Sequence, residues 1–177
     1  GINAEYGEQM NICDKRLMSD FKNIAQNVSS TFMASPFKDN LRRWAAVILG
    51  PEDTAWAGAA LCLSLDFGDD YPTKPPTVKI LTKMFHPNVY NDGSICLDIL
   101  KEKWSPAYDV SSVLVSIQNL LTDPNPQSPA NGEAANLYVR DRNGFDMRVA
   151  KIAEDSWDQI EPGPYVELLD KLIVEEK

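Results

Sequence analysis

The residues most able to do chemistry lie close together near the middle of the chain. Cys96 follows Asn88 by eight residues, and Asn88 closes the triplet His86-Pro87-Asn88. A cysteine thiolate is a good nucleophile and a fair leaving group, so it can take an acyl group from another thioester with little net change in free energy. This segment therefore predicts an acyl-carrying thiol on a stiffened loop.

A cysteine hydrolase is the alternative interpretation of the same thiol. Hydrolysis needs an imidazole that activates both the thiol and water, and the only histidine, His86, is held before a proline. We therefore interpret His86 as a structural hydrogen-bonding group. We expect no lysine or arginine beside Cys96, and we expect Asp98 to oppose thiolate formation, so the thiol should be an ordinary one.

Composition excludes several other classes of protein. The chain has 177 residues, of which 44% are hydrophobic and 24% charged, as in one globular domain. A net charge of −9 without a Lys/Arg-rich run disfavours direct nucleic-acid binding. No apolar run approaches the roughly 20 residues of a membrane helix. Three widely spaced cysteines and one histidine indicate neither a disulfide framework nor a metal site, so we expect a cytoplasmic and nuclear protein.

The elements that must position Cys96 begin with a helix near the N-terminus. From Asp14 onward, apolar residues recur at helical spacing and predict a buried stripe. The stripe comprises Leu17, Met18, Phe21, Ile24, Ala25 and Val28. Residues 1–13 lack this pattern and are expected to form a flexible arm.

Alternating apolar residues predict the strands. The runs 41–49 and 59–67 flank a turn-rich segment and should pair as antiparallel neighbours. Cys62 has the opposite parity to the inward-facing residues of its run, so it should be a poor nucleophile candidate. The inward-facing residues are Leu61, Leu63, Leu65 and Phe67. The run 77–81 predicts a further short strand.

Turn residues and helical spacing organise the rest of the chain. The prolines of 71–76 predict a rigid connector, with Tyr71-Pro72 as the X-Pro bond most suited to a cis peptide. Residues 83–103 have no regular period and predict an ordered functional loop. A central helix is expected to follow Asp109, its N-cap residue. Its apolar residues are Val110, Val113, Leu114, Ile117 and Leu121. The segments 133–138 and 143–157 predict two closing helices, and 166–177 is either a short helix or disordered.

Together, these motifs resemble the ubiquitin-conjugating enzyme family, with similarity from about Asp14 to Trp157. The matching motifs are Tyr71-Pro72-Thr73-Lys74-Pro75-Pro76, His86-Pro87-Asn88, Gly93-Ser94-Ile95-Cys96-Leu97-Asp98-Ile99-Leu100 and Trp104-Ser105-Pro106. The resemblance implies an α+β fold with an N-terminal helix, a four-stranded antiparallel meander sheet, an active-site loop, a central helix and two C-terminal helices. The catalytic domain would span 14–158, and 159–177 would form an acidic extension.

The resemblance also implies an activity. Cys96 would accept ubiquitin from an activating enzyme as a thioester, and transfer to a substrate lysine would form an isopeptide bond with the help of a ligase. No glycine-rich phosphate loop is present, so we expect no cofactor, with ATP used by the separate activating enzyme. Three further segments most resemble the branch that acts in histone ubiquitination, post-replication DNA repair and N-degron turnover. They are Lys83-Met84-Phe85-His86-Pro87-Asn88-Val89-Tyr90, Tyr108-Asp109-Val110-Ser111-Ser112 and Asn125-Pro126-Gln127-Ser128-Pro129-Ala130-Asn131. A catalytically silent relative and a carrier of a ubiquitin-like modifier are the alternatives.

Further site residues follow from the family motifs. Asn88 would either donate a hydrogen bond to the oxyanion or hold the loop through backbone contacts. Tyr90, Asp98 and Ser128 would surround the incoming lysine. Because Pro129 follows Ser128, a proline-directed kinase would install nearly two negative charges there.

Partner surfaces are implied as well. The activating enzyme and a RING-type ligase would contact the first helix, whose basic residues are Lys15, Arg16 and Lys22. The ligase would also contact Phe67 and the loop Ser105-Pro106-Ala107. The inward parity of Phe67 equally predicts a core residue, and the basic face of the helix is equally a solvated surface.

Overall fold

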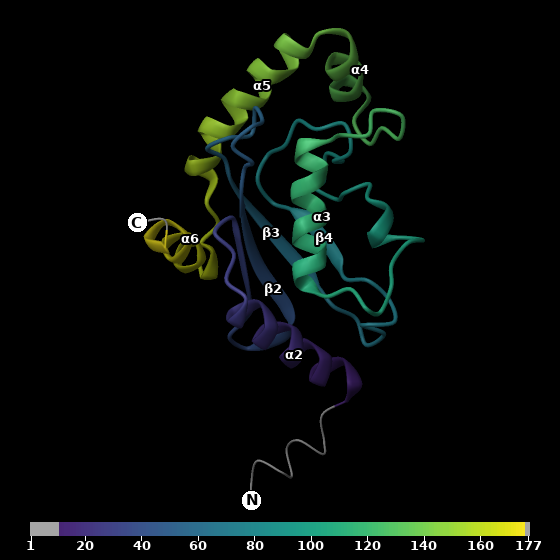
Figure 1. The fold of residues 1–177 in the computed structure, drawn as a ribbon, viewed down its shortest axis with the longest axis vertical. Helices are drawn as coiled ribbons and strands as arrows, with labels where there is room; N and C mark the ends of the chain where they lie inside the picture. Colours follow the sequence, from purple (N-terminus) through teal and green to yellow (C-terminus); the bar gives the residue numbers. More distant parts are fainter. Residues whose placement is uncertain (1–10, 176–177) are drawn as a thin grey trace, which may run out of the picture.

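The centre of the fold is a four-stranded antiparallel sheet in the order β1-β2-β3-β4 (Figure 1). The computed structural model describes residues 11–175, and the strands span Phe32–Phe37, Asn40–Leu49, Ala60–Asp66 and Thr77–Ile80. The meander and the three strands located from the sequence are confirmed. No strand was predicted over residues 32–37; Pro36 lies within β1, and the register with β2 shifts between Pro36 and Phe37.

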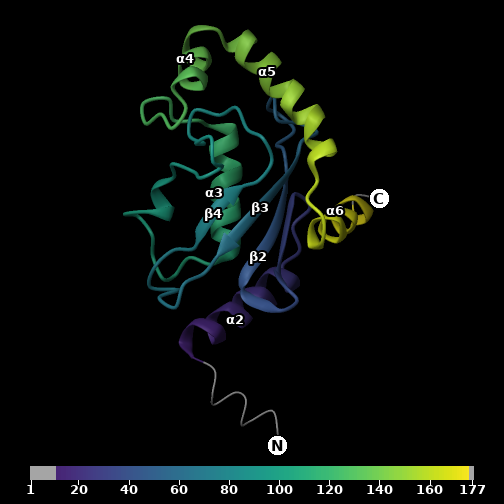
Figure 2. The ribbon, with the colours of Figure 1, turned by 180° about the vertical axis from the view of Figure 1, so that it is seen from behind.

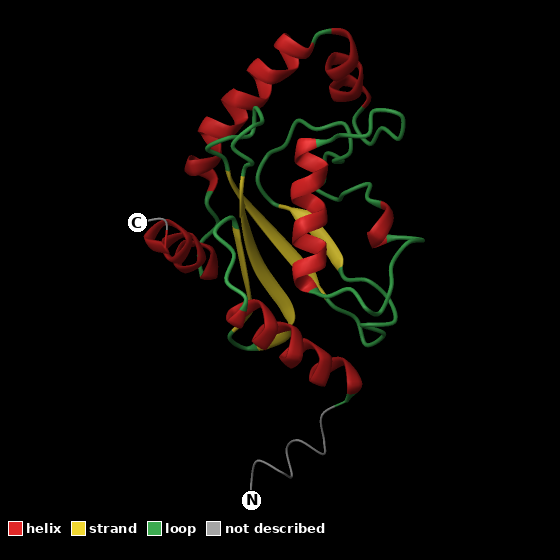
Figure 3. Ribbon diagram, viewed as in Figure 1, coloured by secondary structure: helices red, strands yellow, loops and turns green. Residues whose placement is uncertain are grey.

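Helices cover both faces of this sheet (Figures 2 and 3). They are α2 (Ile12–Gln26), α3 (Val110–Thr122), α4 (Gly132–Arg140), α5 (Arg142–Asp155) and α6 (Pro164–Glu175), with short 3₁₀ turns η1 (Asp98–Leu100) and η2 (Ser156–Gln159). We call the face under α3 the front face and the face under α6 the back face. Within residues 11–175, no helix combines the length and hydrophobicity that crossing a bilayer requires.

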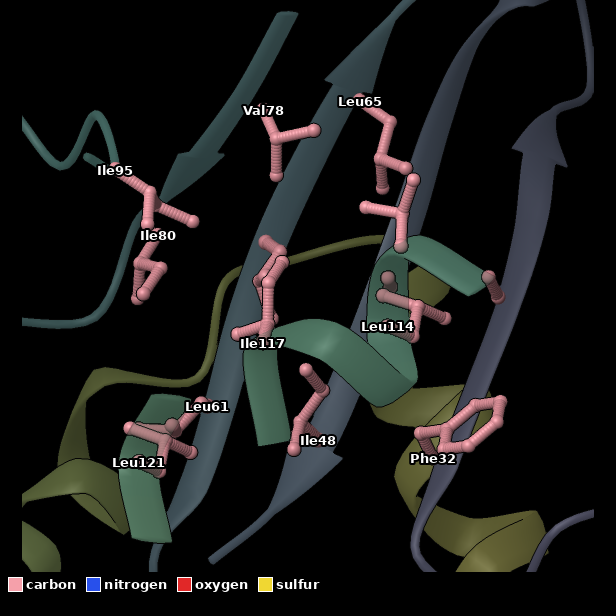
Figure 4. Close-up of a cluster of buried hydrophobic side chains, with 14 of the residues drawn as sticks. Phe32, Ile48, Leu61, Leu65, Val78, Ile80, Ile95, Leu114, Ile117 and Leu121 are labelled. Carbon is pink, nitrogen blue, oxygen red and sulfur yellow. The ribbon is translucent and has the colours of Figure 1, made fainter. Parts of the chain in front are cut away.

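The front face holds the main core, and α3 packs across it (Figure 4). All five apolar residues predicted for this helix are buried, and they face Ile48, Leu61 and Leu65 of the sheet. Asp109 accepts a hydrogen bond from the Ser112 N–H at 2.9 Å as part of a capping box, which fixes where the helix begins. The predicted central helix and its cap are therefore confirmed.

The back face is covered by α6, the helix alternative for the C-terminal segment. Cys62 points to this face, as predicted, and α6 buries it completely. The Tyr165 hydroxyl donates a hydrogen bond to the Leu63 carbonyl at 2.9 Å, and the apolar residues of α6 pack around it. The cluster comprises Ala45, Val47, Ala60, Cys62, Tyr165, Leu168, Leu169 and Leu172. The last two residues of the chain lie outside the described range.

Fewer of the apolar residues predicted for the first helix are buried than the sequence indicates. Leu17 and Ile24 are buried, whereas Met18 is 52% exposed and Val28, beyond the end of α2, is 56% exposed. Phe21 is exposed as well, at 38%, with its ring edge-on to that of Trp44. Cys13 and Asp20 complete the buried face instead. The helix begins at Ile12, inside the arm expected over 1–13, and residues 1–10 of that arm lie outside the described residues.

Candidate active site

A turn and a short bridge position Cys96. The Cys96 N–H donates to the Asn88 carbonyl at 2.8 Å, and Val89 pairs with Ile95 across the turn. Gly93 has φ +89°, and a Cβ there would clash with the Ile80 carbonyl oxygen, so the turn requires glycine. This backbone holds the Cys96 thiol partly exposed at the surface.

Cys96 opens onto a groove of about 320 Å³ built from three segments of the chain. Of the residues predicted for the site, Asp98 and Ser128 line this groove with Cys96. The full lining is Cys96, Leu97, Asp98, Lys101, Glu102, Leu120, Asn125 and Ser128. Tyr90, 42% exposed, is not one of these lining residues.

A lysine lies beside the candidate nucleophile, contrary to the expectation of no such neighbour. The Lys101 ammonium nitrogen, Nζ, is 3.7 Å from Cys96 Sγ. The 3₁₀ turn η1 between the two residues reverses the chain, which brings Lys101 back over Cys96. Asp98 instead faces Lys103, whose Nζ lies 3.5 Å from its carboxylate. The charges around the sulfur therefore include a cation that the sequence analysis missed.

Asn88 is buried and fully engaged in hydrogen bonds. Its Nδ2 donates to the carbonyls of Asn125 and Ser128, at 2.7 and 2.9 Å. Its Oδ1 accepts from the Asn125 N–H at 2.8 Å. Since both amide hydrogens already have partners, the side chain joins the Cys96 loop to the proline-rich segment 124–129. Donation to an oxyanion would require one of these bonds to break.

His86 is completely buried under this loop. Its Nδ1 accepts a hydrogen bond from the Asn88 N–H at 2.9 Å, so Nε2 carries the proton and donates to the Leu120 carbonyl at 2.9 Å. Burial lowers the pKa of His86 to about 4, which keeps the ring neutral at physiological pH. Both ring nitrogens are occupied by backbone groups, so the imidazole is not available as a base.

The basic face predicted for the first helix divides into two parts. Lys15 and Lys22 are exposed. The Arg16 guanidinium is instead held within the chain, because it donates to the carbonyls of Pro106 and Tyr108 at 2.8 and 2.7 Å. Arg16 therefore ties α2 to the loop 105–107, in which Pro106 and Ala107 are exposed and Ser105 is half-buried.

The buried carboxylate of Asp20 holds the Arg16 side chain in this position. Asp20 accepts hydrogen bonds from Arg16 Nε and from the Tyr71 hydroxyl. Burial raises the pKa of Asp20, although both hydrogen bonds act in the opposite direction. Phe67 packs against the Tyr71 ring and is only 5% exposed, so its placement as a partner contact is wrong. The core alternative for Phe67 is the one that the structure shows.

The groove residues that were not predicted for the site are Leu97, Lys101, Glu102, Leu120 and Asn125. Lys101 and Glu102 lie in the loop that follows Cys96. Their closeness to Cys96 along the chain was the only signal in the sequence that could have placed them at the site. Asn125 lies between two prolines of a segment already predicted to be rigid, but its backbone bonds to Asn88 have no signature in sequence. Within residues 11–175, no cluster of three potential ligands could hold a metal ion.

Comparison with known proteins gives one family. Residues 16–153 match the family model described as "Ubiquitin-conjugating enzyme". The chain is 53% identical over 145 residues to "Ubiquitin-conjugating enzyme E2 2" of Debaryomyces hansenii, covering 82% of this chain and 86% of that one. It is 52% identical over 143 residues to "Ubiquitin-conjugating enzyme E2 1" of Caenorhabditis elegans, covering 81% and 74%. The chain belongs to the ubiquitin-conjugating enzyme family.

A third relative, "Ubiquitin-conjugating enzyme E2 3" of Arabidopsis thaliana, is 51% identical over 143 residues, which cover 81% of this chain and 95% of that one. Ubiquitin-conjugating enzymes are transferases that work through a cysteine thioester, and the fold predicted from that resemblance is confirmed. The family model ends at residue 153, so α6 lies beyond the matched region.

Proposed function

We propose that Cys96 accepts ubiquitin from an activating enzyme as a thioester and passes it to a substrate lysine with the help of a ligase. One observation carries the assignment to this residue. Of the three cysteines, Cys13 and Cys62 are buried, and only Cys96 opens onto a groove. The thiol also stands at the cysteine of the family motif, in a loop fixed by Asn88.

Loading and discharge are two acyl transfers. In loading, the Cys96 thiolate attacks the carbonyl carbon of the incoming thioester, the old C–S bond breaks, and the cysteine of the activating enzyme leaves as a thiolate. In discharge, the neutral amine of a lysine attacks the Cys96 thioester, the C–S bond breaks and an isopeptide bond forms. Since the imidazole of His86 is buried and fully bonded, no histidine activates water beside the thioester. Slow hydrolysis preserves the loaded form for transfer.

Asn88 serves as a positioning residue in this proposal. Its three hydrogen bonds to residues 125 and 128 hold the far wall of the groove against the Cys96 loop. Asp98 and Ser128 line the groove and supply polar groups for the incoming lysine. Tyr90 flanks the loop outside the groove. Phosphorylation of Ser128, which is exposed and precedes Pro129, would add negative charge where the lysine arrives.

The proposed partner contacts are the exposed residues of α2 and of the loop 105–107. Lys15 and Lys22 of α2 offer positive charge to the activating enzyme, and α2 with the exposed residues Pro106 and Ala107 offers a surface to a RING-type ligase. We place the enzyme in the cytoplasm and nucleus, in the branch of histone ubiquitination, post-replication repair and N-degron turnover. The motifs quoted above support this branch.

A loading assay tests the proposed function. The chain is incubated with activating enzyme, ATP and ubiquitin, and a band that thiol reagents remove is expected on a non-reducing gel. Cys96→Ala should abolish the band, whereas Cys13→Ala, which alters a buried thiol, should retain it. A band that survives in Cys96→Ala would contradict the assignment.

Three alternatives have their own readouts. Loading with a ubiquitin-like modifier in place of ubiquitin would change the cargo but not the chemistry. Steady release of ubiquitin from a fusion substrate would instead favour a hydrolase, which needs a base that the neutral, bonded His86 does not supply. Absence of any loading would favour a catalytically silent relative.

A further inference from the structure

A second groove lies between α5 and the loop 83–85. It holds about 430 Å³, within the range of sites that receive a bulky side chain or a small ligand. Its lining and that of the Cys96 groove share no described residue. In Figure 1, α5 lies at the end of the molecule opposite α2. This groove is therefore separate from the candidate active site and from the partner surface proposed on α2.

The apolar part of this groove is adaptable. Phe85 is only 4% exposed, and Ile152 of α5 is half-buried in the same lining. Met84 and Met147 complete the apolar lining, and Met147 is 75% exposed. A methionine side chain is flexible and polarisable, so the two thioethers can fit apolar side chains of different shapes. The groove therefore offers an apolar side chain of a ligand a place to pack.

Arg148 is fixed beside this apolar lining from two sides. Its guanidinium carbon lies 3.7 Å from the centroid of the Phe85 ring, so the cation stacks on the ring face. Its Nη1 lies 2.7 Å from a carboxylate oxygen of Glu133 in α4. A guanidinium has five N–H donors, and Glu133 is the one carboxylate that pairs with Arg148 among residues 11–175. The side chain is thus held in place with donors left for a further carboxylate.

The groove carries positive charge in an acidic chain. Its lining has three cations, Lys83, Arg148 and Lys151, and one anion, Asp155. Lys151 pairs with Asp155 at 3.1 Å, whereas Lys83 is exposed and forms no salt bridge within the described residues. Even with Glu133 counted, cations outnumber anions here, while the whole chain has a net charge of −9. An acidic ligand is therefore attracted to this groove and repelled by the chain as a whole.

We propose that the groove docks a short acidic segment of a partner protein, in which a bulky apolar side chain is flanked by carboxylates. The apolar side chain packs against Phe85 and Ile152, and the carboxylates pair with Arg148 and Lys83. A nucleic-acid backbone would use the cations but leave the apolar lining uncovered, so the groove favours a peptide. Docking does not involve the thiol and is independent of the function proposed for Cys96.

Docking at this groove leaves α2 and the Cys96 groove free. A protein that carries such a segment and also engages either of these surfaces is held at two sites at once. Its effective concentration at the second site rises without any new contact there. This consequence for substrates and ligases rests on the proposed function, whereas the docking itself does not.

NMR of methionine methyl groups tests the docking with the full chain. The probe is a synthetic peptide in which a leucine–phenylalanine pair is flanked on each side by a run of glutamates. We expect saturable shifts at the methyl groups of Met84 and Met147, which line the groove, and none at Met18, which is exposed on α2. Higher ionic strength should weaken the binding, because salt screens exposed charges.

Two arginines of α5 provide matched variants. Arg148→Glu reverses the charge in the groove, whereas Arg142→Glu reverses it outside the groove, at a guanidinium that stacks on the Tyr138 ring at 3.5 Å. We expect binding about tenfold weaker in Arg148→Glu, through loss of a charge-assisted hydrogen bond, and unchanged in Arg142→Glu. Lys83→Glu, at an exposed side chain, should also weaken binding and keeps the test decisive if Arg148→Glu does not fold.

Altered probes complete the test. A peptide with serines in place of the apolar pair and a peptide with lysines in place of the glutamates should each bind more weakly. Equal affinity for either peptide, undiminished binding in Arg148→Glu or Lys83→Glu, shifts confined to Met18, or tighter binding of a single-stranded oligonucleotide would overturn the proposal. Shifts at Met147 that depend on protein concentration without peptide would assign the groove to a second copy of this chain instead. Cys96→Ala should bind the peptide as the unmodified chain does, so failure of docking is distinguishable from failure of the proposed function.

Discussion

The two faces of the sheet carry different kinds of cover. The front face is packed by α3 and bordered by the Cys96 loop, and it falls within residues matched by the family model. The back face presents small side chains, such as Ala45 and Ala60, and α6 from beyond that match lies over them. The difference teaches that the candidate site borders one side of this sheet, while the other side is closed by a helix beyond the residues that the family model matches.

Strand β3 and two cysteines show the same contrast between the two faces. Every residue of β3 except the last is buried, so alternation no longer separates a core face from a solvent face. Burial raises the pKa of the Cys62 thiol on the back face. Cys96 on the loop is partly exposed, and Cys62 beneath α6 has no exposed surface. The accessibility of the two thiols therefore reports separately on the two sides.

The largest expected effect comes from releasing the back face. Leu172→Asp places a charge at a side chain with no exposed surface, which should destabilise docking of α6 by about 4 kcal/mol. Since each 1.4 kcal/mol changes an equilibrium tenfold, labelling of Cys62 by a thiol reagent should accelerate about a thousandfold. Loading at Cys96 should persist. Peptide mapping of the labelled thiols measures both.

Ile173→Asp provides the control for this prediction, because Ile173 is the adjacent residue and is 38% exposed. Its Cys62 labelling should stay close to that of the unmodified chain. Equal acceleration in both variants, or loss of Cys96 loading in Leu172→Asp, would show that the two faces are not independent.

A smaller effect is expected from a cavity on the front face. Leu114 of α3 is completely buried, so Leu114→Ala should lower the free energy of unfolding by about 3 kcal/mol through lost burial and an unfilled cavity. Denaturant unfolding measures the change. Val115→Ala, at a side chain 43% exposed, should stay within about 0.5 kcal/mol. If Val115→Ala lowered the free energy of unfolding as much as Leu114→Ala, burial of Leu114 in the front-face core would not explain the effect.

The smallest effect is the pH dependence of the Cys96 loop. The pKa of His86 is about 4 in the folded chain and near 6.5 when unfolded, so the unfolded chain binds more protons between these values. Stability is complete above pH 6.5 and declines as pH falls toward 4, by about 2 kcal/mol at pH 5. Unfolding midpoints from pH 7 to 5 measure the slope, and His86→Gln should flatten it. An unchanged slope in that variant would assign the loss to other groups.

The sequence pattern was sufficient to locate those elements whose signals lie within one continuous segment of the chain. The apolar spacing from Val110 to Leu121 and the cap at Asp109 located α3, and the family motif located Cys96 on its loop. Phe67 was left between core and contact because parity alone does not show what covers a strand. The packing of α6 was unpredictable for the same reason, since the back face that it covers is formed by residues more than a hundred positions earlier.

The missed contacts share one physical cause. Lys101 follows Cys96 by five residues, and only the reversal of the chain at η1 brings its amine to the sulfur. Arg16 has the spacing of an exposed helical residue, yet its partners are carbonyls 90 and 92 positions further along the chain. Such contacts depend on the positions of the loops in the folded chain, which composition and periodicity do not encode.

The position of Arg16 links two surfaces that partners are proposed to contact. One guanidinium holds the loop 105–107 against α2, so a ligand that shifts this loop would also change the free energy of binding on the helix. Thermodynamic linkage would make the effect equal in both directions. Arg16 would then be the side chain through which the two surfaces respond to each other.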